Sequence, residues 1–231
     1  MVDKIWSCLR SIHRFLQDQL LYPLLLSSLL AVAFWAGRVL LSSSWLFYRN
    51  LIWNLFLAWI PYGFSFLAAG LHLLLPRQWW LLILPAVGWL AFFPNAPYLL
   101  TDFLHLQARP GIPLWFDILL LAAFAWSGLF LAVASLQTMH RIVKAYLGWL
   151  GGWVFAMTAL GLSGLGLYLG RFSRWNSWDL VLQPRDIFAD LFHRFTNPFS
   201  NLTFFGFTLM FTAFLLVCYL TFISVRRVGN R

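Results

Sequence analysis

Glutamate is absent from this sequence of 231 residues, and charged residues of any kind make up only 10% of it. Soluble domains usually carry about 25% charged residues, so the ordinary soluble globular class is excluded. Hydrophobic residues reach 61%, which is more than a soluble core of this length could bury. The composition therefore predicts a protein whose solvent is lipid.

Cysteine is also scarce, with only Cys8 and Cys218. The two lie far apart in the sequence and form no metal-binding or redox motif, which excludes a disulfide-rich scaffold. A P-loop, the HExxH and GxSxG motifs and a glycine-rich dinucleotide fingerprint are missing as well. Because none of these common enzyme motifs is present, none of them assigns a function to the chain.

Long apolar runs are what the sequence does contain. Six of them have membrane-spanning length, at residues 20–41, 51–75, 79–93, 114–136, 146–170 and 199–223. We therefore predict an all-α fold, a polytopic helical bundle of about six transmembrane helices. Residues 1–19 form a basic N-terminus, 20–223 a single membrane domain and 224–231 a basic C-terminal tail.

Lysine and arginine predict the orientation of the bundle. The net charge of +9 comes from scattered basic residues, which argues against nucleic acid as a partner. With six spans, nine basic residues fall on the side of the termini and six on the other side. The positive-inside rule then makes the termini cytoplasmic, with the lipid bilayer and anionic lipid headgroups as partners.

The segment FPNAPYLLTDFLHL, residues 93–106, places Asn95, Tyr98, Asp102 and His105 between apolar residues. In a helix these four side chains share one face. Asp102 and His105 could then act as acid and base, or bind one divalent metal ion. The alternative is a helix that starts after Pro94, with Asn95 as its N-cap and its polar face in water.

Asp117 lies a few residues inside the fourth predicted span, in PLWFDILLLAAFAW. An aspartate at this depth needs a cavity or a cation beside it. Arg109, just upstream, or Arg171, in the next outer segment, could neutralise it. Asp117 is therefore a candidate catalytic residue, with a structural ion pair as the alternative.

The segment LGLYLGRFSRWNSWD, residues 165–179, is rich in cations and amides. Arg171 and Arg174, at i and i+3 of a helix, could grip a phosphate or carboxylate. Asn176 and Trp178 would contribute to substrate binding, and Asp179 would be a base or ligand. The alternative is simply the turn that ends a span.

The segment QPRDIFADLFHRF, residues 183–195, predicts an amphipathic helix on the outer leaflet, with an apolar face rich in phenylalanine. Asp190 and Arg194 are spaced to pair at i and i+4. His193 is a further candidate ligand.

The first three of these segments, including WFDILLLAAFAWSG, resemble a bacterial family of multi-spanning membrane proteins, the domain of unknown function 1361. The similarity covers about residues 51–222. It implies a bacterial inner-membrane protein but no activity. It also implies that the family pattern includes Asn95, Tyr98, Thr101, Asp102, His105, Asp117, Arg171, Asn176, Ser177, Trp178 and Asp179.

The residues favour a polar site on the outer face of the membrane. In this hypothesis Asp102, His105, Asp117 and Asp179 are metal ligands or acid/base groups, and the arginines hold an anionic lipid-linked substrate. The protein would then be an envelope hydrolase or transferase. Two alternatives stay open: a proton-coupled transporter or small-solute binder, and a membrane scaffold or assembly factor.

Overall fold

The computed structural model describes residues 2–42, 48–108 and 111–229, and within these ranges the chain forms helices and no β-strand. Five segments of the described chain are helical, long and apolar enough to cross a membrane: α2 (Leu21–Ser42), α3 (Arg49–Leu74), Trp79–His105, Leu114–Ser173 and Pro198–Arg226. The predicted all-α, polytopic membrane fold is thereby confirmed.

The longest segment contains α6 (Leu114–Tyr168), which folds back on itself at Gly148. Gly148 has a φ of 72°, a left-handed conformation that glycine adopts without steric cost. The rings of His140 and Trp153 lie 4.9 Å apart, whereas a straight helix would separate residues 140 and 153 by about 20 Å. Residues 114–147 and 149–168 therefore form two limbs, which agrees with the six spans predicted.

The third span is made of four short helices: η1 (Trp79–Leu82), α4 (Ile83–Phe92), α5 (Asn95–Tyr98) and η2 (Leu99–His105). Pro94 and Pro97 interrupt it, because proline has no N–H to donate inside a helix. The span runs on to His105 rather than ending at residue 93. The prediction of one continuous α-helical face was wrong, although Asp102 and His105 still share a side of the 3₁₀ helix η2.

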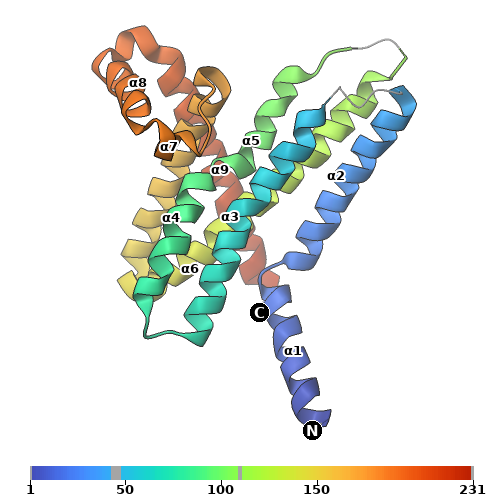
Figure 1. The fold of residues 1–231 in the computed structure, drawn as a ribbon, viewed down its shortest axis with the longest axis vertical. Helices are drawn as coiled ribbons and strands as arrows, with labels where there is room; N and C mark the ends of the chain where they lie inside the picture. Colours follow the sequence, from blue (N-terminus) through green and yellow to red (C-terminus); the bar gives the residue numbers. More distant parts are fainter. Residues whose placement is uncertain (1, 43–47, 109–110, 230–231) are drawn as a thin grey trace.

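The two ends of the described chain lie at the same end of the bundle (Figure 1). There α1 (Val2–Asp18) leads into α2, and α9 (Leu202–Gly229) ends. We call the opposite end the distal end. It carries the start of α3, η2, and the short elements η3 (Leu169–Ser173), α7 (Asp179–Leu182), α8 (Pro184–Thr196) and η4 (Pro198–Asn201). That residues 20–223 act as one domain stays a prediction.

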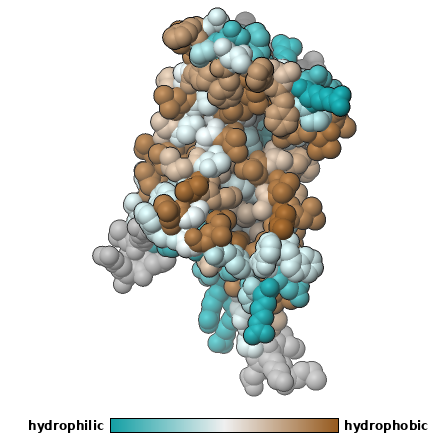
Figure 2. All heavy atoms as spheres, turned by 90° about the vertical axis from the view of Figure 1, so that its left-hand side faces the viewer, coloured by the Kyte–Doolittle hydropathy of each residue, from teal (hydrophilic) through white to brown (hydrophobic). Residues whose placement is uncertain are grey.

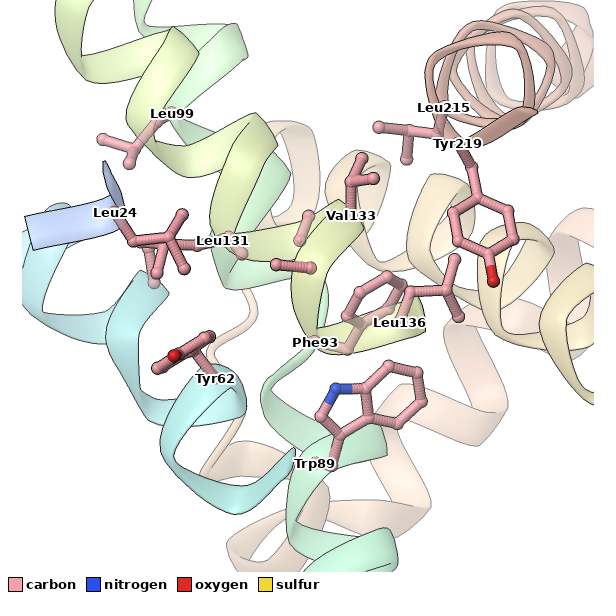
Figure 3. Packing of buried hydrophobic residues seen from close by; sticks show 14 of the residues in the cluster. Leu24, Tyr62, Trp89, Phe93, Leu99, Leu131, Val133, Leu136, Leu215 and Tyr219 are labelled. Carbon is pink, nitrogen blue, oxygen red and sulfur yellow. The ribbon is translucent and has the colours of Figure 1, made fainter. Parts of the chain in front are cut away.

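Large apolar side chains fill the interior of the bundle. Trp89 and Phe93 of the third span are at most 1% exposed and pack where this span meets α6 (Figure 3). Yet apolar side chains also cover the outside, where Leu26, Leu84 and Leu209 are 69%, 79% and 71% exposed. Figure 2 shows hydrophobic residues across the middle of one face and hydrophilic residues towards its two ends. This is the surface of a protein embedded in a lipid bilayer.

Gly128 of α6 brings α5 close to the centre of the bundle. A Cβ at this position would lie 2.3 Å from the carbonyl oxygen of Ala96 and 2.7 Å from Leu99 Cδ1. No other residue type leaves room for so close a backbone approach. Gly128 thus sets the depth at which α5 and η2 pack, and with them Tyr98 and Asp102.

Candidate functional site

A hollow of about 530 Å³ lies at the distal end, between the start of α3, η2 and η3. We call it the distal pocket. The described residues that line it are Tyr48, Arg49, Asn50, Leu51, Trp53, Asn54, Tyr98, Asp102, His105, Gln107 and Arg171. Three segments far apart in the sequence therefore meet here, and they bring together four of the predicted site residues: Tyr98, Asp102, His105 and Arg171.

Asp102 forms the floor of the distal pocket and is only 4% exposed. Its Oδ2 accepts a hydrogen bond of 3.0 Å from the Nδ2 of Asn54 on α3. Its Oδ1 lies 3.6 Å from Nη1 of Arg171. A buried carboxylate needs such donors, and here they come from two different helices.

Arg171 reaches the pocket from η3, a single π-helical turn that ends the second limb of α6. Its guanidinium lies 6.0 Å from the centre of the Tyr98 ring, at the limit for a cation–π contact. The neighbouring Gly170 allows the backbone of this segment to approach Tyr98, since a Cβ at position 170 would lie 3.2 Å from the Tyr98 ring. Short π-helical turns inside α-helices are frequent at functional sites.

His105 is the last residue of η2 and lies, exposed, in the wall of the pocket. Its exposure leaves the imidazole accessible to a ligand. Among the described residues, no group of three or more histidine, cysteine or acidic side chains is arranged to hold a metal ion. A metal bound by Asp102 and His105 therefore stays a prediction, while the contacts of Asp102 are with an amide and a guanidinium.

Asp117 lies outside the residues that line the pocket, and its partner is not Arg171, one of the two that the sequence predicted. Arg38 of α2 donates from Nε to Asp117 Oδ1 at 2.6 Å, and both side chains are 2% exposed. Tyr48 adds a long hydrogen bond of 3.4 Å to Asp117 Oδ2. Arg171 is paired with Asp102 instead, and Arg109 falls outside the described residues. The structure therefore agrees with the alternative, a structural ion pair.

Asn95 does not cap a helix, which corrects the alternative interpretation of this residue. It is the first residue of α5, behind Pro94, and makes no capping hydrogen bond. Its Nδ2 donates instead to Ser177 Oγ at 2.9 Å. Asn95 thus joins α5 to the segment that carries Arg171, but it is not among the lining residues of the pocket.

The remaining predicted residues of the 171–179 segment lie away from the pocket lining. Asp179 accepts hydrogen bonds from the backbone N and the Nδ2 of Asn176, at 2.7 and 3.2 Å, and so closes a turn. Arg174 is exposed and left-handed, with φ 61°. The predicted shared helix face of Arg171 and Arg174 is wrong, because η3 ends between them. Trp178 is 39% exposed, outside the pocket.

Sequence reasoning missed the contribution of α3 to the site. Arg49, Asn50, Trp53 and Asn54 all line the pocket. A signal was present, because Asn50 and Asn54, at i and i+4 of a span, share one side of a helix, and polar residues in a span rarely face lipid. That pattern did not predict which residue they face across the pocket, because Asp102 lies some fifty residues later in the sequence.

A comparison with protein families identifies a match to the family described as protein of unknown function (DUF1361), over residues 53–218. The matched range contains Asn54, Asp102 and Arg171, and begins just after Arg49. No curated protein and no solved structure matches the chain.

Proposed function

The chain belongs to the DUF1361 family, and we propose that its distal pocket binds the anionic headgroup of a lipid-linked substrate. The observation that carries this proposal is the meeting of Arg49 and Arg171 in one pocket around the single carboxylate of Asp102. Two guanidiniums outweigh one carboxylate, so the pocket attracts negative charge. Guanidinium groups also match the geometry of phosphate and carboxylate.

The surroundings of the pocket support a ligand that carries a lipid tail. Trp53, in the wall of the pocket, is 53% exposed, and its ring lies 5.4 Å from that of Phe56, which is 56% exposed. Both side chains belong to the membrane span α3, so this aromatic surface continues from the pocket into lipid. An acyl or isoprenoid chain can lie along it while the headgroup enters the pocket.

The acid and base of the pocket favour a hydrolase or transferase over a passive binder. Asp102 is buried beside Arg171, and His105 is exposed in the same pocket. In this proposal His105 exchanges protons with the substrate, since its imidazole is exposed in the wall of the pocket. Asp102 holds Arg171 in position for the anionic group.

Phosphatidic acid is a suitable probe for the binding step, with phosphatidylcholine as the control lipid. Native mass spectrometry of the detergent-solubilised protein should detect a preference for phosphatidic acid. We expect Arg171→Gln to weaken this binding by about tenfold or more, since a charged hydrogen bond contributes roughly 1.5–3 kcal/mol. Phosphate release from the same lipid, lost in His105→Ala, tests the enzymatic step.

Arg174→Gln is the matched control, because it removes the same charge three residues away but outside the pocket lining. An equal loss in both variants would mean that only the overall field of the distal end attracts the lipid. Equal binding of both lipids by the wild-type protein would refute the proposal. Binding without phosphate release would refute its enzymatic part for this substrate.

We propose further that the protein resides in a bacterial inner membrane, with the distal end facing outward. The basic residues on the side of the termini support this orientation. Cys8 is exposed on α1, at the end opposite the pocket, whereas Cys218 is half-buried in α9. A membrane-impermeant maleimide should therefore label Cys8 in inverted vesicles but not in intact cells. Labelling in intact cells would reverse the orientation.

A further inference from the structure

The helix α8 at the distal end has three distinct faces. One face packs against the protein, with Ile187 only 3% exposed and Leu191 half-buried. A second face carries Phe188, Phe192 and Phe195, at i, i+4 and i+7, which are 66%, 72% and 56% exposed. The third face carries exposed polar side chains, among them Asp186 and His193. A helix that only covered the end of the bundle would need this packed face and no second apolar face.

Hydrogen bonds fix the rotation of α8 about its axis. Asp190 accepts from Arg194 Nε at 2.9 Å, which confirms the predicted pair, and also from Ser173 Oγ at 3.1 Å and Trp175 Nε1 at 3.3 Å. The Arg194 guanidinium lies over the Tyr168 ring, 5.1 Å from its centre. Because these contacts hold α8 to the end of α6, Phe188 and Phe192 cannot turn inward. The ring of Phe195, at the end of the same face, lies 5.8 Å from that of Phe204 in α9 and remains half exposed.

The exposed aromatic face is continuous with a surface that lies in lipid. After α8 come Phe199 and Leu202, which are 88% and 66% exposed, and then the membrane span α9. On the other side, Val181 of α7 is 81% exposed. The short helices α7 and η4, which both contact α8, thus add exposed apolar residues on either side of it. Figure 1 shows α7 next to α8 at the distal end.

We propose that α8 lies in the interface of the leaflet at the distal end, with Phe188, Phe192 and Phe195 inserted among the acyl chains. Interfacial helices have this arrangement, with aromatic side chains on the lipid side and charges towards water. The occupant of the aromatic face is therefore the bilayer itself. Asp190 then ties a lipid-inserted helix to Ser173, two residues from Arg171 in the distal pocket. The insertion is independent of what the pocket binds.

Fluorescence quenching in vesicles tests the insertion. In a Cys8→Ser, Cys218→Ser background, Phe188→Cys and Asp186→Cys each receive an environment-sensitive label. The two positions are two residues apart on opposite sides of α8, and both are exposed, so the label should not disturb packing. The full chain is reconstituted in phosphatidylcholine vesicles that contain brominated acyl chains.

We expect the label at position 188 to lie roughly 5–10 Å into the boundary between headgroups and acyl chains. The brominated lipid should quench it, and aqueous iodide should not. Aqueous iodide should quench the label at position 186, and the brominated lipid should not. Phe192→Cys and His193→Cys form a second pair with the same expectation, in case one variant does not fold.

Two results would overturn the proposal. Quenching of the label at position 188 by iodide would mean that the aromatic face lies in water. Protection of that label from both quenchers would mean that a protein surface, such as a second copy of the chain, covers it. A ligand-binding defect in the distal pocket would change neither result, so the two proposals are tested separately.

Discussion

Asp117 and Asp102 are two buried aspartates at the distal end, and each faces an arginine from another helix, yet the two ion pairs differ in geometry. Asp117 and Arg38 are 2.6 Å apart, and both side chains are 2% exposed. Asp102 and Arg171 are 3.6 Å apart, with 6% and 11% of their side chains exposed. The first pair is closed and dry, and the second is loose and borders a pocket.

In our proposal this difference separates a structural pair from one that serves the pocket. A direct, fully buried ion pair has no room for a ligand, so its role is to hold α2 against α6. A longer pair at the edge of a cavity leaves donor positions of the arginine directed at whatever enters. The same residue types at the same end of the bundle therefore form two pairs of different geometry, and our proposal assigns the ligand-binding role to the looser one.

The largest effect that we expect is on stability, from Asp117→Ala. This change leaves the Arg38 guanidinium buried without its carboxylate, which in other proteins costs about 3–5 kcal/mol. Thermal unfolding of the detergent-solubilised protein measures the loss. The double replacement Arg38→Met, Asp117→Leu is the control and should regain most of the stability, because it removes both charges. If Asp117→Ala unfolds like the wild type, the pair does not hold the bundle.

Gly128→Ala should act on the site of Asp102 while leaving the Asp117 pair intact. The added Cβ meets the Ala96 carbonyl oxygen, and overpacking of this kind typically costs about 1–3 kcal/mol. Displacement of α5 should also weaken phosphatidic acid binding, which native mass spectrometry can follow.

Gly161→Ala is the matched control, because nothing lies within 4 Å of a Cβ at that position. It should leave binding unchanged and should not destabilise the protein, because alanine favours a helix by about 0.5–1 kcal/mol over glycine. If Gly128→Ala also left binding unchanged, the close packing of α5 would not set the geometry of the pocket.

Asp102→Asn should have a smaller effect on stability, and an opposite effect on binding. The amide keeps the shape of the side chain, but the charge that opposes an anionic ligand disappears beside Arg171. We expect phosphatidic acid to bind roughly tenfold more tightly, about 1.4 kcal/mol, because the loss of the opposing charge outweighs the weaker hold on Arg171. Weaker binding would mean that Asp102 positions Arg171 more than it competes with the ligand.

The sequence predicts what depends on composition and on local pattern. The apolar runs predict the spans, and the i and i+4 spacing of Asp190 and Arg194 predicts their pair, which the structure contains. The partner of Asp117 was missed because Arg38 lies 79 residues earlier in the chain. The divergence of Arg171 and Arg174 was missed because the π-helical turn η3, which contains Arg171, ends before Arg174, and Arg174 is itself left-handed. Such features depend on packing rather than on period.

The replacement Tyr48→Phe should have the smallest effect on stability, and it tests whether Asp102 and Asp117 act independently of each other. Its side chain lines the pocket of Asp102, and its hydroxyl donates to Asp117 Oδ2 over 3.4 Å. A bond this long contributes little, so Tyr48→Phe should lower stability by at most about 0.5–1 kcal/mol. Phosphatidic acid binding, measured on the same sample, should stay within about twofold of the wild type, since the ring remains in the wall. A larger change in binding would mean that the Arg38–Asp117 pair acts on the pocket through Tyr48, and that the two aspartates form one connected site.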